Sequence, residues 1–292
     1  MIIVKLQGGL GNQMFQYAAA RAISNNIQVL FDTRFLTSNT KTTSSFTPRQ
    51  LELSVFKNIK IQIADKLTIY LLEKSVLVSK YLKSLFFIDV KIISEAESGV
   101  FVNLNREQNA TVYLDGYFQN ENNFKVIRKQ LLHDFKFPIL TDAYKNMEDK
   151  IRSISNSVSI HARRGDYLKP EVNMYHGTLP LTYYQKAQKR IEERVSRPHY
   201  FIFSDDPDWC RSNLLFLTND ATIVSEANHT GWEDMYLMSL CQHHIIANST
   251  YSWWGAWLNE NPYKIVIAPD KWFANETLNK QTEIVPNSWI KL

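Results

Sequence analysis

Two adjacent arginines follow a run of residues typical of a core strand in the stretch SIHARRGDY, residues 159–167. The run predicts a buried strand, and alternation along that strand places His161 and Arg163 on the same face. An arginine guanidinium donates to two phosphate oxygens at once, which the point charge of a lysine does not do. The pattern favours a diphosphate site at the strand end. A surface turn with an arginine–aspartate ion pair is the alternative.

Polar residues also follow the next strands that the sequence predicts. In parallel sheets the carboxyl ends of the strands meet at one edge, and ligands bind beyond that edge. The residues concerned are Ser204, Asp205 and Asp206 after residues 199–204, and Asn248, Ser249 and Thr250 after residues 244–248. The second set suits a helix N-cap, where amides and hydroxyls also bind phosphate. We therefore expect a polar site along this edge.

The sequence gives little support for a metal. Asp206, Pro207 and Asp208 form an Asp-x-Asp pattern that holds divalent cations in many enzymes. Pro207 also suits the first position of a helix and Asp206 its N-cap, so we expect a helix start here. The two cysteines, Cys210 and Cys241, have no metal-binding or disulfide spacing. We predict that the protein uses no metal.

A glycine-rich turn, QGGLGNQ, follows the first predicted strand. It lets the backbone approach a ligand, but the dinucleotide fingerprint requires a glycine where Met14 stands. Asp32 fits the acid that a nicotinamide-dependent oxidoreductase needs after its second strand, so that class is a less favoured alternative. A noncatalytic carbohydrate-binding module is another, although it needs no paired arginines. The turn is also compatible with a plain strand-to-helix connection.

Alternating strands and helices must position these residues. Residues 1–32 predict a strand, a turn, a helix and a second strand. In the second half the expected strands are 157–163, 199–204, 221–225, 244–248 and 264–268, and the expected helices are 180–195, 207–217, 232–242 and 250–259. Such alternation predicts doubly wound parallel sheets. We place a boundary near 140–155, giving α/β domains over 1–150 and 151–292.

Composition narrows the class of protein. The chain has 292 residues, of which 45% are hydrophobic, enough for one large core or two ordinary ones. Its formal net charge of +4, from 33 basic and 29 acidic residues, is too balanced to argue for nucleic acid. The first residues lack the basic leader and cleavage site of a signal peptide. We expect a cytoplasmic protein.

Two segments, residues 37–50 and 67–93, are not part of the alternation of strands and helices. Residues 37–50 are rich in serine and threonine and predict a loop, either a lid or a disordered segment. Residues 67–93 are strongly apolar but are interrupted by charges, so they predict core packing and no membrane span. A basic amphipathic face resting on the cytoplasmic side of the inner membrane is the alternative.

Taken together, the motifs GGLGNQMFQYA, YLDGYFQ, HARRGDY, FSDD and NSTYSWWGAWL resemble the α-1,2-fucosyltransferase family, glycosyltransferase family 11, in its bacterial form. The resemblance covers nearly the whole chain. It implies a GT-B-like pair of facing Rossmann-type domains, GDP-β-L-fucose as donor, inversion to an α-fucoside and no cofactor. It also implies a terminal galactose 2-hydroxyl as acceptor, on an O-antigen unit, a Lewis-type glycan or lactose, and leaves the choice among them open.

The same resemblance assigns roles to residues. It implies that Arg163 binds the β-phosphate, that His161 lies against guanine and that Asp234 accepts hydrogen bonds from the guanine edge. The N-terminal domain falls on the acceptor side and the C-terminal domain binds the donor. The other implied donor-binding residues are Gly9, Gly11 and Asn12 in the first turn, Asp205 in the nucleotide pocket, and Asn248, Ser249, Thr250 and Tyr251 around the diphosphate.

Inverting transfer also needs a group that takes the proton from the acceptor hydroxyl. Asp166 and Glu171 are the candidates, and the spacing of Glu171 from His161 is similar to that of the basic glutamate in α-1,6-fucosyltransferases. A dissociative route needs little base, so the role stays open. We expect Arg164 to pair with an acid such as Asp166 and to brace the loop.

Overall fold

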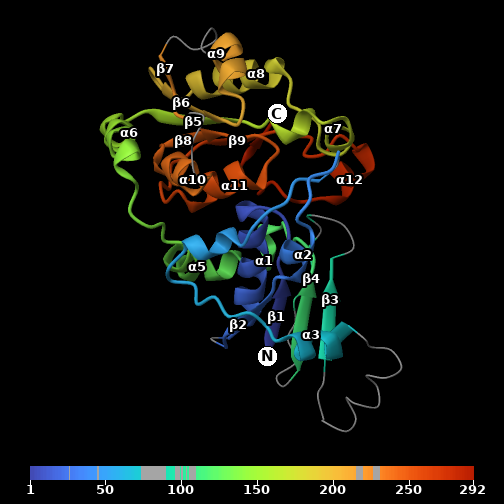
Figure 1. Cartoon of the computed structure of the whole chain (residues 1–292). Helices are drawn as coiled ribbons and strands as arrows, with labels where there is room; N and C mark the ends of the chain where they lie inside the picture. Colours follow the sequence, from blue (N-terminus) through green and yellow to red (C-terminus); the bar gives the residue numbers. More distant parts are fainter. Residues whose placement is uncertain are drawn as a thin grey trace. The chain divides into compact units, whose positions relative to one another are not determined.

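The computed structural model describes residues 1–25, 27–44, 46–73, 90–95, 99, 101–102, 104, 110–214, 220–225 and 231–292. Most of the apolar segment 67–93 and the end of the helix predicted over 207–217 lie outside these residues. Within the described parts, no helix has both the length and the apolarity needed to cross a bilayer. The chain divides by its internal contacts into two compact units (Figure 1).

Unit 1 comprises Met1–Lys41, Pro48–Lys136 and Gln281–Ile284. Its sheet is parallel, with the strand order β2-β1-β4-β3. The strands are β1 (Ile2–Lys5), β2 (Val29–Asp32), β3 (Val90–Ser94) and β4 (Thr111–Asp115). The helices are α1 (Leu10–Ile23), α2 (Arg34–Ser38), α3 (Lys66–Glu73) and α5 (Arg128–Asp134), with 3-10 turns at Glu52–Val55, Glu121–Asn123 and Lys125–Ile127.

The predicted strand–turn–helix–strand unit at the N-terminus is confirmed, but the turn is shorter than expected. Helix α1 begins at Leu10, so Gly11 and Asn12 lie inside the helix and only Gly8 and Gly9 remain in the turn. Gly8 has a positive φ of 76°, which a side chain disfavours. The carboxylate of Glu52 accepts the Leu10 N–H at 3.0 Å and replaces a conventional N-cap.

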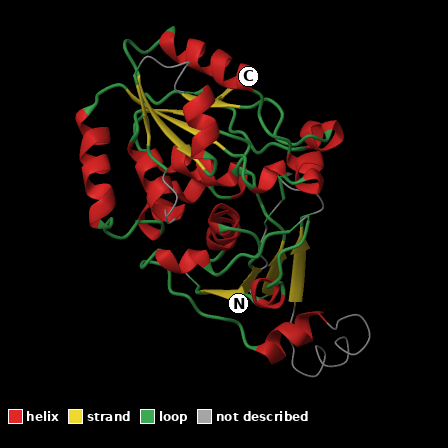
Figure 2. Ribbon diagram, turned by 45° about the horizontal axis from the view of Figure 1, so that its top comes forward, coloured by secondary structure: helices red, strands yellow, loops and turns green. Residues whose placement is uncertain are grey.

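Unit 2 comprises Thr42–Thr47, Phe137–Lys280 and Val285–Leu292. Its sheet is also parallel, with the order β10-β9-β8-β5-β6-β7. The strands are β5 (Ser157–Ala162), β6 (His199–Ser204), β7 (Ala221–Ile223), β8 (His243–Ile245), β9 (Val266–Ala268) and β10 (Ile290–Lys291). The helices are α6 (Asp142–Ser153), α7 (Pro170–His176), α8 (Leu181–Glu192), α9 (Pro207–Asn213), α10 (Gly231–Leu240), α11 (Thr250–Leu258) and α12 (Glu276–Gln281), with a 3-10 turn at Asp166–Leu168. Helices cover both faces of this sheet (Figure 2).

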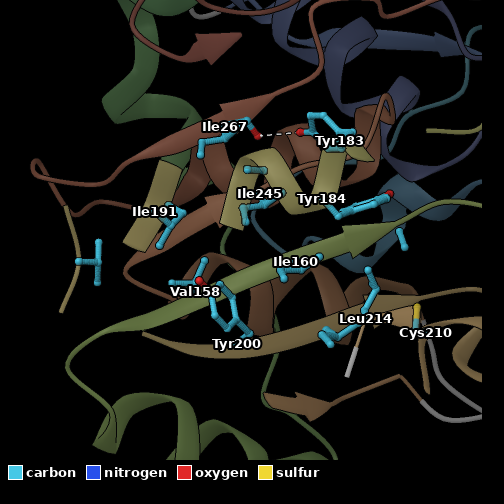
Figure 3. Packing of buried hydrophobic residues seen from close by; sticks show 14 residues of the cluster. Val158, Ile160, Tyr183, Tyr184, Ile191, Tyr200, Cys210, Leu214, Ile245 and Ile267 are labelled. Atoms are coloured by element: carbon cyan, nitrogen blue, oxygen red, sulfur yellow. Dashed lines mark hydrogen bonds between the residues drawn. The ribbon is translucent and has the colours of Figure 1, made fainter. Parts of the chain in front are cut away.

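The central strands β5 and β6 of unit 2 are buried on both faces. One face of β5 carries Val158 and Ile160, which pack with Ile202 of β6 and with α8 (Figure 3). The other core cluster joins β6 to α10 and α6. The second face of β5 carries Ser157, Ser159 and His161, which are buried as well, so the strand is covered on both sides as a central parallel strand is. The tryptophans of α11 are core residues, since Trp253 and Trp254 are fully buried.

The division between the units falls between Lys136 and Phe137. The sequence placed it later, with domains over 1–150 and 151–292. Helix α6 explains the difference, because Tyr144 and Ile151 of that helix are part of the core of unit 2. Two short segments, Thr42–Thr47 and Gln281–Ile284, belong to the unit opposite to their neighbours in sequence, a pattern that hydrophobic periodicity does not reveal.

Candidate functional site

Arg163 lies directly after β5 at the carboxyl edge of the sheet of unit 2. Its Nη2 is 2.6 Å from Oδ1 of Asp166 and its Nη1 is 2.9 Å from Oδ2 of Asp205. Burial disfavours the charged guanidinium, but the carboxylates of Asp205 and Asp166 outweigh it and raise the pKa of Arg163. Two negative charges therefore meet one positive charge before any ligand arrives. The carboxylates of Asp166 and Asp205 thus neutralise Arg163 within the protein itself.

Arg164 has a different partner from the one expected. Its Nε is 3.1 Å from Oδ2 of Asp206, and its guanidinium lies 4.2 Å from the ring centroid of Trp209. Asp166 pairs with Arg163 instead. Arg164 still braces its loop, as predicted, by linking it to the start of α9.

The start of α9 confirms the interpretation of Asp206 and Pro207 as a helix start. Oδ1 of Asp206 accepts the N–H of Trp209 at 3.1 Å, and Pro207 occupies the first turn. Among the described residues, no cluster of three histidines, cysteines or carboxylates has the geometry of a metal site. The carboxylate of Asp206 thus binds the N–H of Trp209 and the guanidinium of Arg164.

Asp205 holds the loop that carries both arginines. Besides its contact with Arg163, its Oδ1 accepts the backbone N–H of Arg164 at 2.8 Å. A Cβ on Gly165 would lie 2.5 Å from Oδ2 of Asp205. The glycine of the HARRGD motif therefore lets this carboxylate approach the backbone, which ties the loop to the residue that follows β6.

His161 is a buried, neutral imidazole on the same strand. Only 4% of its surface is exposed, and its Nδ1 has no hydrogen-bond partner in the described structure. Burial, together with the nearby Arg163, lowers the pKa of His161 to about 3. Its ring centroid is 5.6 Å from that of Tyr251. An unpaired buried nitrogen is costly, so His161 is a strong candidate for contacting a ligand.

Asp234 and Tyr251 lie behind this edge of the sheet. Oδ2 of Asp234 accepts the hydroxyl of Ser225 at 2.5 Å, and Oγ of Ser225 accepts the N–H of Ser204 at 3.0 Å. Tyr251 is partly buried, and its hydroxyl donates to the carbonyl of Gly231. Burial, and then the Asp234 charge, raise the pKa of Tyr251. Asp234 thus links β6 to α10 at the position where the resemblance places guanine.

The prediction that residues 248–251 surround the diphosphate is only partly consistent with the structure. Ser249 is the N-cap of α11, and its Oγ accepts the N–H of Tyr251 at 3.4 Å. Thr250 begins the helix and is half-buried. Asn248, however, donates through Nδ2 to the carbonyls of His176, Gly177 and Trp272 at 2.8, 3.1 and 3.2 Å. Its amide nitrogen therefore ties loops together and is not directed to a phosphate.

Sequence reasoning missed an aromatic stack beside Arg163. The guanidinium is 5.5 Å from the ring centroid of Tyr167, and that ring stacks on His176 at 4.7 Å with an interplanar angle of 11°. The Tyr167 hydroxyl donates to the carbonyl of Asn248 at 3.1 Å. Burial lowers the pKa of His176 to about 4. Tyr167 lies within the RRGDY stretch, but no signal in the sequence pointed to His176.

The remaining predicted residues lie elsewhere. The carboxylate of Glu171 is exposed and accepts a hydrogen bond from Ser44 at 2.8 Å. Gly9, Gly11 and Asn12 belong to unit 1, where Oδ1 of Asn12 accepts from Nε2 of Gln119 at 2.9 Å. Unit 2 thus brings together Arg163, Asp166, Asp205 and His161, whereas Glu171 makes its contact with the segment Thr42–Thr47.

Each unit is an α/β unit built on a parallel sheet, and the charged site lies beyond the carboxyl edge of the sheet in unit 2. These features are those of the class of GT-B-like glycosyltransferases. The family model described as glycosyl transferase family 11 matches residues 1–292. The chain therefore belongs to glycosyltransferase family 11.

Several known proteins are similar to this chain. The O-antigen biosynthesis glycosyltransferase WbnK of Escherichia coli is 35% identical over 312 residues, covering 98% of this chain and 99% of WbnK. An α-1,2-colitosyltransferase of Escherichia coli is 34% identical over 308 residues, covering 100% and 99%. Human galactoside α-(1,2)-fucosyltransferase 1 is 29% identical over 103 residues, covering 35% and 28%. The structure of an Arabidopsis thaliana FUT1 mutant in complex with GDP aligns with a TM-score of 0.50 at 11% identity, covering 91% of this chain and 69% of that chain.

Proposed function

We propose that this glycosyltransferase is an inverting α-1,2-transferase that moves L-fucose from GDP-β-L-fucose to the 2-hydroxyl of a terminal galactose. The linkage is supported by the names of the full-length colitosyl relative and the partly matching fucosyl relatives. The observation that carries the proposal is the rigid Arg163 at the carboxyl edge of unit 2, in a chain of this family. An O-antigen unit is the acceptor class that the name of WbnK supports.

In such a transfer the bond between the anomeric carbon and the β-phosphate oxygen breaks, and negative charge develops on GDP. A new bond forms from the acceptor 2-hydroxyl oxygen to the opposite face of that carbon, and the hydroxyl proton leaves. Arg163 is the donor placed to stabilise the leaving phosphate, because its two carboxylate contacts fix it before the substrate binds. The N–H groups that Asp166 and Asp205 leave uncovered are those available to the phosphate.

The carboxylates of this edge hold the arginine, and that role accounts for their excess negative charge. Asp166 is engaged by Arg163, so we assign it to positioning the guanidinium and not to accepting the proton. Glu171 remains the candidate base. Profiles of rate against pH for Glu171→Gln and Asp166→Asn test this assignment: loss of the acidic limb only in the Glu171 variant supports it, and an unchanged profile removes Glu171.

The sugar of the donor is either L-fucose or colitose, and an experiment distinguishes them. Colitose is L-fucose without its 3-hydroxyl, so one pocket admits both unless it hydrogen-bonds or excludes that group. The test is to incubate the enzyme separately with GDP-fucose and GDP-colitose and a panel of β-1,3- and β-1,4-galactosides, then to determine the linkage by NMR. An α-1,2-fucoside is the expected product. Exclusive use of GDP-colitose would correct the donor, and transfer from neither would refute the proposal.

A further inference from the structure

The geometry points to a binding site for the acceptor sugar at the carboxyl edge of the sheet in unit 1, formed by Lys5 and Asp115. This inference rests on the proposed transfer to a sugar and adds the residues that recognise it. The stretch YLDGYFQ, which contains Asp115, has no role in the donor site described above.

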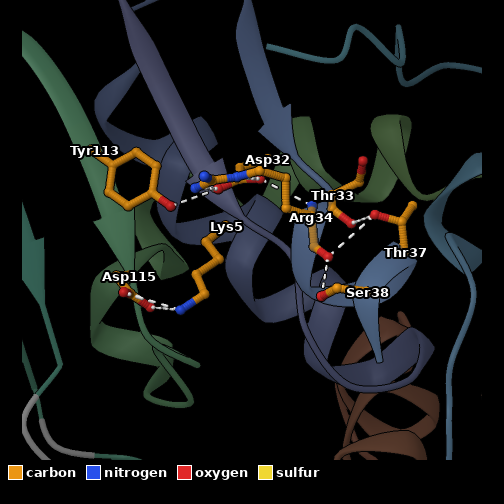
Figure 4. A network of polar contacts seen from close by, with 8 residues as sticks. All are labelled: Lys5, Asp32, Thr33, Arg34, Thr37, Ser38, Tyr113 and Asp115. Carbon is orange, nitrogen blue, oxygen red and sulfur yellow. Dashed lines mark hydrogen bonds and ion pairs between the residues drawn. The ribbon is translucent and has the colours of Figure 1, made fainter. Parts of the chain in front are cut away.

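Three neighbouring strands of this sheet end in charged residues at the same level. Lys5 is the last residue of β1 and is in register with Asp32, the last residue of β2. Val4 pairs with Leu114, which brings Lys5 beside Asp115 at the end of β4. Nζ of Lys5 is 3.0 Å from Oδ1 of Asp115 (Figure 4). Ligands of parallel sheets bind beyond this edge.

The charged residues at the ends of these three strands, which form a row of Asp32, Lys5 and Asp115, differ in their surroundings. Asp32 is fully buried, and its carboxylate is occupied by Arg34 Nη2 at 2.8 Å and by the hydroxyl of Tyr113 at 2.7 Å. The side chains of Lys5 and Asp115 are 28% and 38% exposed. Within the described residues, neither has a second side-chain partner. Asp32 is therefore structural, whereas the Lys5–Asp115 pair is presented to solvent.

The loop after Asp115 is built rigidly. The half-buried carboxylate of Glu95 accepts the N–H groups of Tyr117 and Phe118 at 2.5 and 2.8 Å. Phe118 has a positive φ of 53°, which is unusual for a bulky residue and requires support from its surroundings. A Cβ on Gly116 would lie 2.5 Å from Cβ of Glu95. Asp115 is thus held in a fixed position.

Two buried polar atoms beside these loops have no partner in the described structure. Gln16 is fully buried, and its Oε1 accepts the N–H of Gln7, two residues beyond Lys5, while its Nε2 is unpaired. Asn123 is bonded to the carbonyl of Phe118, three residues beyond Asp115, while its Oδ1 is unpaired. Unpaired buried polar atoms are rare and mark places where a polar ligand or water completes the structure.

The charge balance of the row identifies the class of ligand. Lys5 and Arg34 carry positive charges, while Asp32, Asp115 and the nearby Glu95 carry carboxyl groups, so this edge has no excess of positive charge with which to bind an anion. A sugar hydroxyl donates one hydrogen bond and accepts others, which matches an adjacent carboxylate and ammonium group. A neutral, hydroxyl-rich sugar therefore fits this edge, and a terminal β-galactoside is the acceptor to which we assign it.

The test uses the full chain with lactose and Gal-β-1,3-GalNAc as probes. Asp115→Asn and Lys5→Met are expected to lower kcat/KM for the galactoside by about 10- to 100-fold, because a hydrogen bond to a charged group is lost. GDP affinity and the slow hydrolysis of GDP-fucose without acceptor should change less than about twofold. Unchanged kcat/KM in both variants would overturn the site.

Two controls separate recognition from a structural role. The swapped double variant, Lys5→Asp with Asp115→Lys, re-forms the ion pair, so it should restore the melting temperature but not galactoside transfer. Recovery of transfer in the swap would show that the pair is merely structural. Arg21→Met removes the contact with Asp134, another ion pair of unit 1, and should leave acceptor kinetics unchanged.

Binding of the probes without turnover distinguishes this inference from the proposed function. Saturation-transfer NMR with lactose and Gal-β-1,3-GalNAc measures binding even if no sugar is transferred. Binding that Asp115→Asn abolishes would support the site even where transfer fails and the proposed function falls. Equal binding to wild type and variant, or no binding of either probe to wild type, would overturn the site.

Discussion

Arg163 shows how a charge at the end of a core strand is accommodated. Its guanidinium is held by Asp166 and Asp205 and lies near the ring of Tyr167. The pairing stabilises the partly buried cation, and it also removes the need to order the side chain during the reaction. The residue is thus preorganised, which is the property that transition-state stabilisation requires.

We predict that Arg163→Ala lowers kcat by at least about 100-fold, because one preorganised donor to the leaving phosphate is lost. Arg163→Lys should also be poor, since an ammonium cannot reproduce the two-pronged contact with Asp166 and Asp205. Steady-state kinetics with GDP-fucose measure both effects. Arg164→Lys is the matched control: it keeps a cation near Trp209 and should retain most activity. Near-normal turnover in Arg163→Lys would refute the assignment.

The two buried histidines predict a dependence of stability on pH. The pKa of His161 is lowered to about 3 and that of His176 to about 4, below the ordinary value near 6.5. Between pH 6.5 and the lowered pKa the unfolded chain binds more protons, so the stability falls as the pH decreases. From pH 6.5 to 5 the loss for His161 is about 2 kcal/mol.

Thermal unfolding from pH 7 to 5 measures this loss. His161→Gln keeps a polar side chain that does not titrate, so its melting temperature should fall less over the same range. Equal slopes for wild type and variant would mean that His161 is not buried in its neutral form. Because both histidines stay neutral near pH 7, we expect neither to act as the acid in the transfer.

At the level of elements, the loop after β5 and helix α7 act as one support for Arg163. Tyr167 stacks on His176 of α7 and donates to the carbonyl of Asn248, which in turn binds the end of α7. This arrangement gives Asn248 a role in positioning in place of the predicted phosphate contact. The aromatic ring, and not the hydroxyl, is the part that lies beside Arg163.

We therefore predict that Tyr167→Phe retains most of kcat, while Tyr167→Leu lowers kcat about tenfold or more with little change in the KM for GDP-fucose. Loss of the ring removes a cation–π contact and frees the guanidinium. Tyr183→Phe is a matched control, since the Tyr183 hydroxyl donates to the carbonyl of Ile246 at 2.7 Å without touching Arg163. Equal kinetics of Tyr167→Leu and Tyr183→Phe would contradict the support role.

At the level of the whole molecule, each unit has a parallel sheet with its own core and its own charged carboxyl edge. The edge of unit 2 carries the guanidinium of Arg163, held by two carboxylates, whereas the edge of unit 1 carries the Lys5–Asp115 pair. The nucleotide is proposed for unit 2 because a guanidinium donates several hydrogen bonds to phosphate oxygens, and the neutral sugar is proposed for unit 1. Substitutions at one edge should change the kinetics of only one substrate.

A whole-molecule prediction concerns metals. We expect GDP to bind and fucose to be transferred equally in EDTA and in millimolar Mg²⁺, since Arg163 and backbone donors supply the charge stabilisation proposed for the leaving group. Isothermal titration with GDP and a transfer assay under both conditions measure this. A loss of activity in EDTA that Mg²⁺ or Mn²⁺ restores would show that a cation is required.

The sequence by itself determined the order of the elements and much of the charged edge of unit 2. The strands expected over 157–163 and 199–204 are found as β5 and β6, because their residue pattern reports burial. The helix start at Asp206 and Pro207 was also readable, since capping is a local property. The boundary between units was not, because α6 joins its core through contacts distant in sequence.

Tertiary structure alone decided which charges meet. The sequence shows Arg163, Arg164 and Asp166 as neighbours, but the pairing of Arg163 with Asp205 depends on the register between β5 and β6. The place of His176 behind Tyr167, and the meeting of Lys5 with Asp115, are likewise set by packing and strand order. Periodicity reports which face of an element is buried, whereas a site consists of side chains from several elements, whose distances only the folded chain fixes.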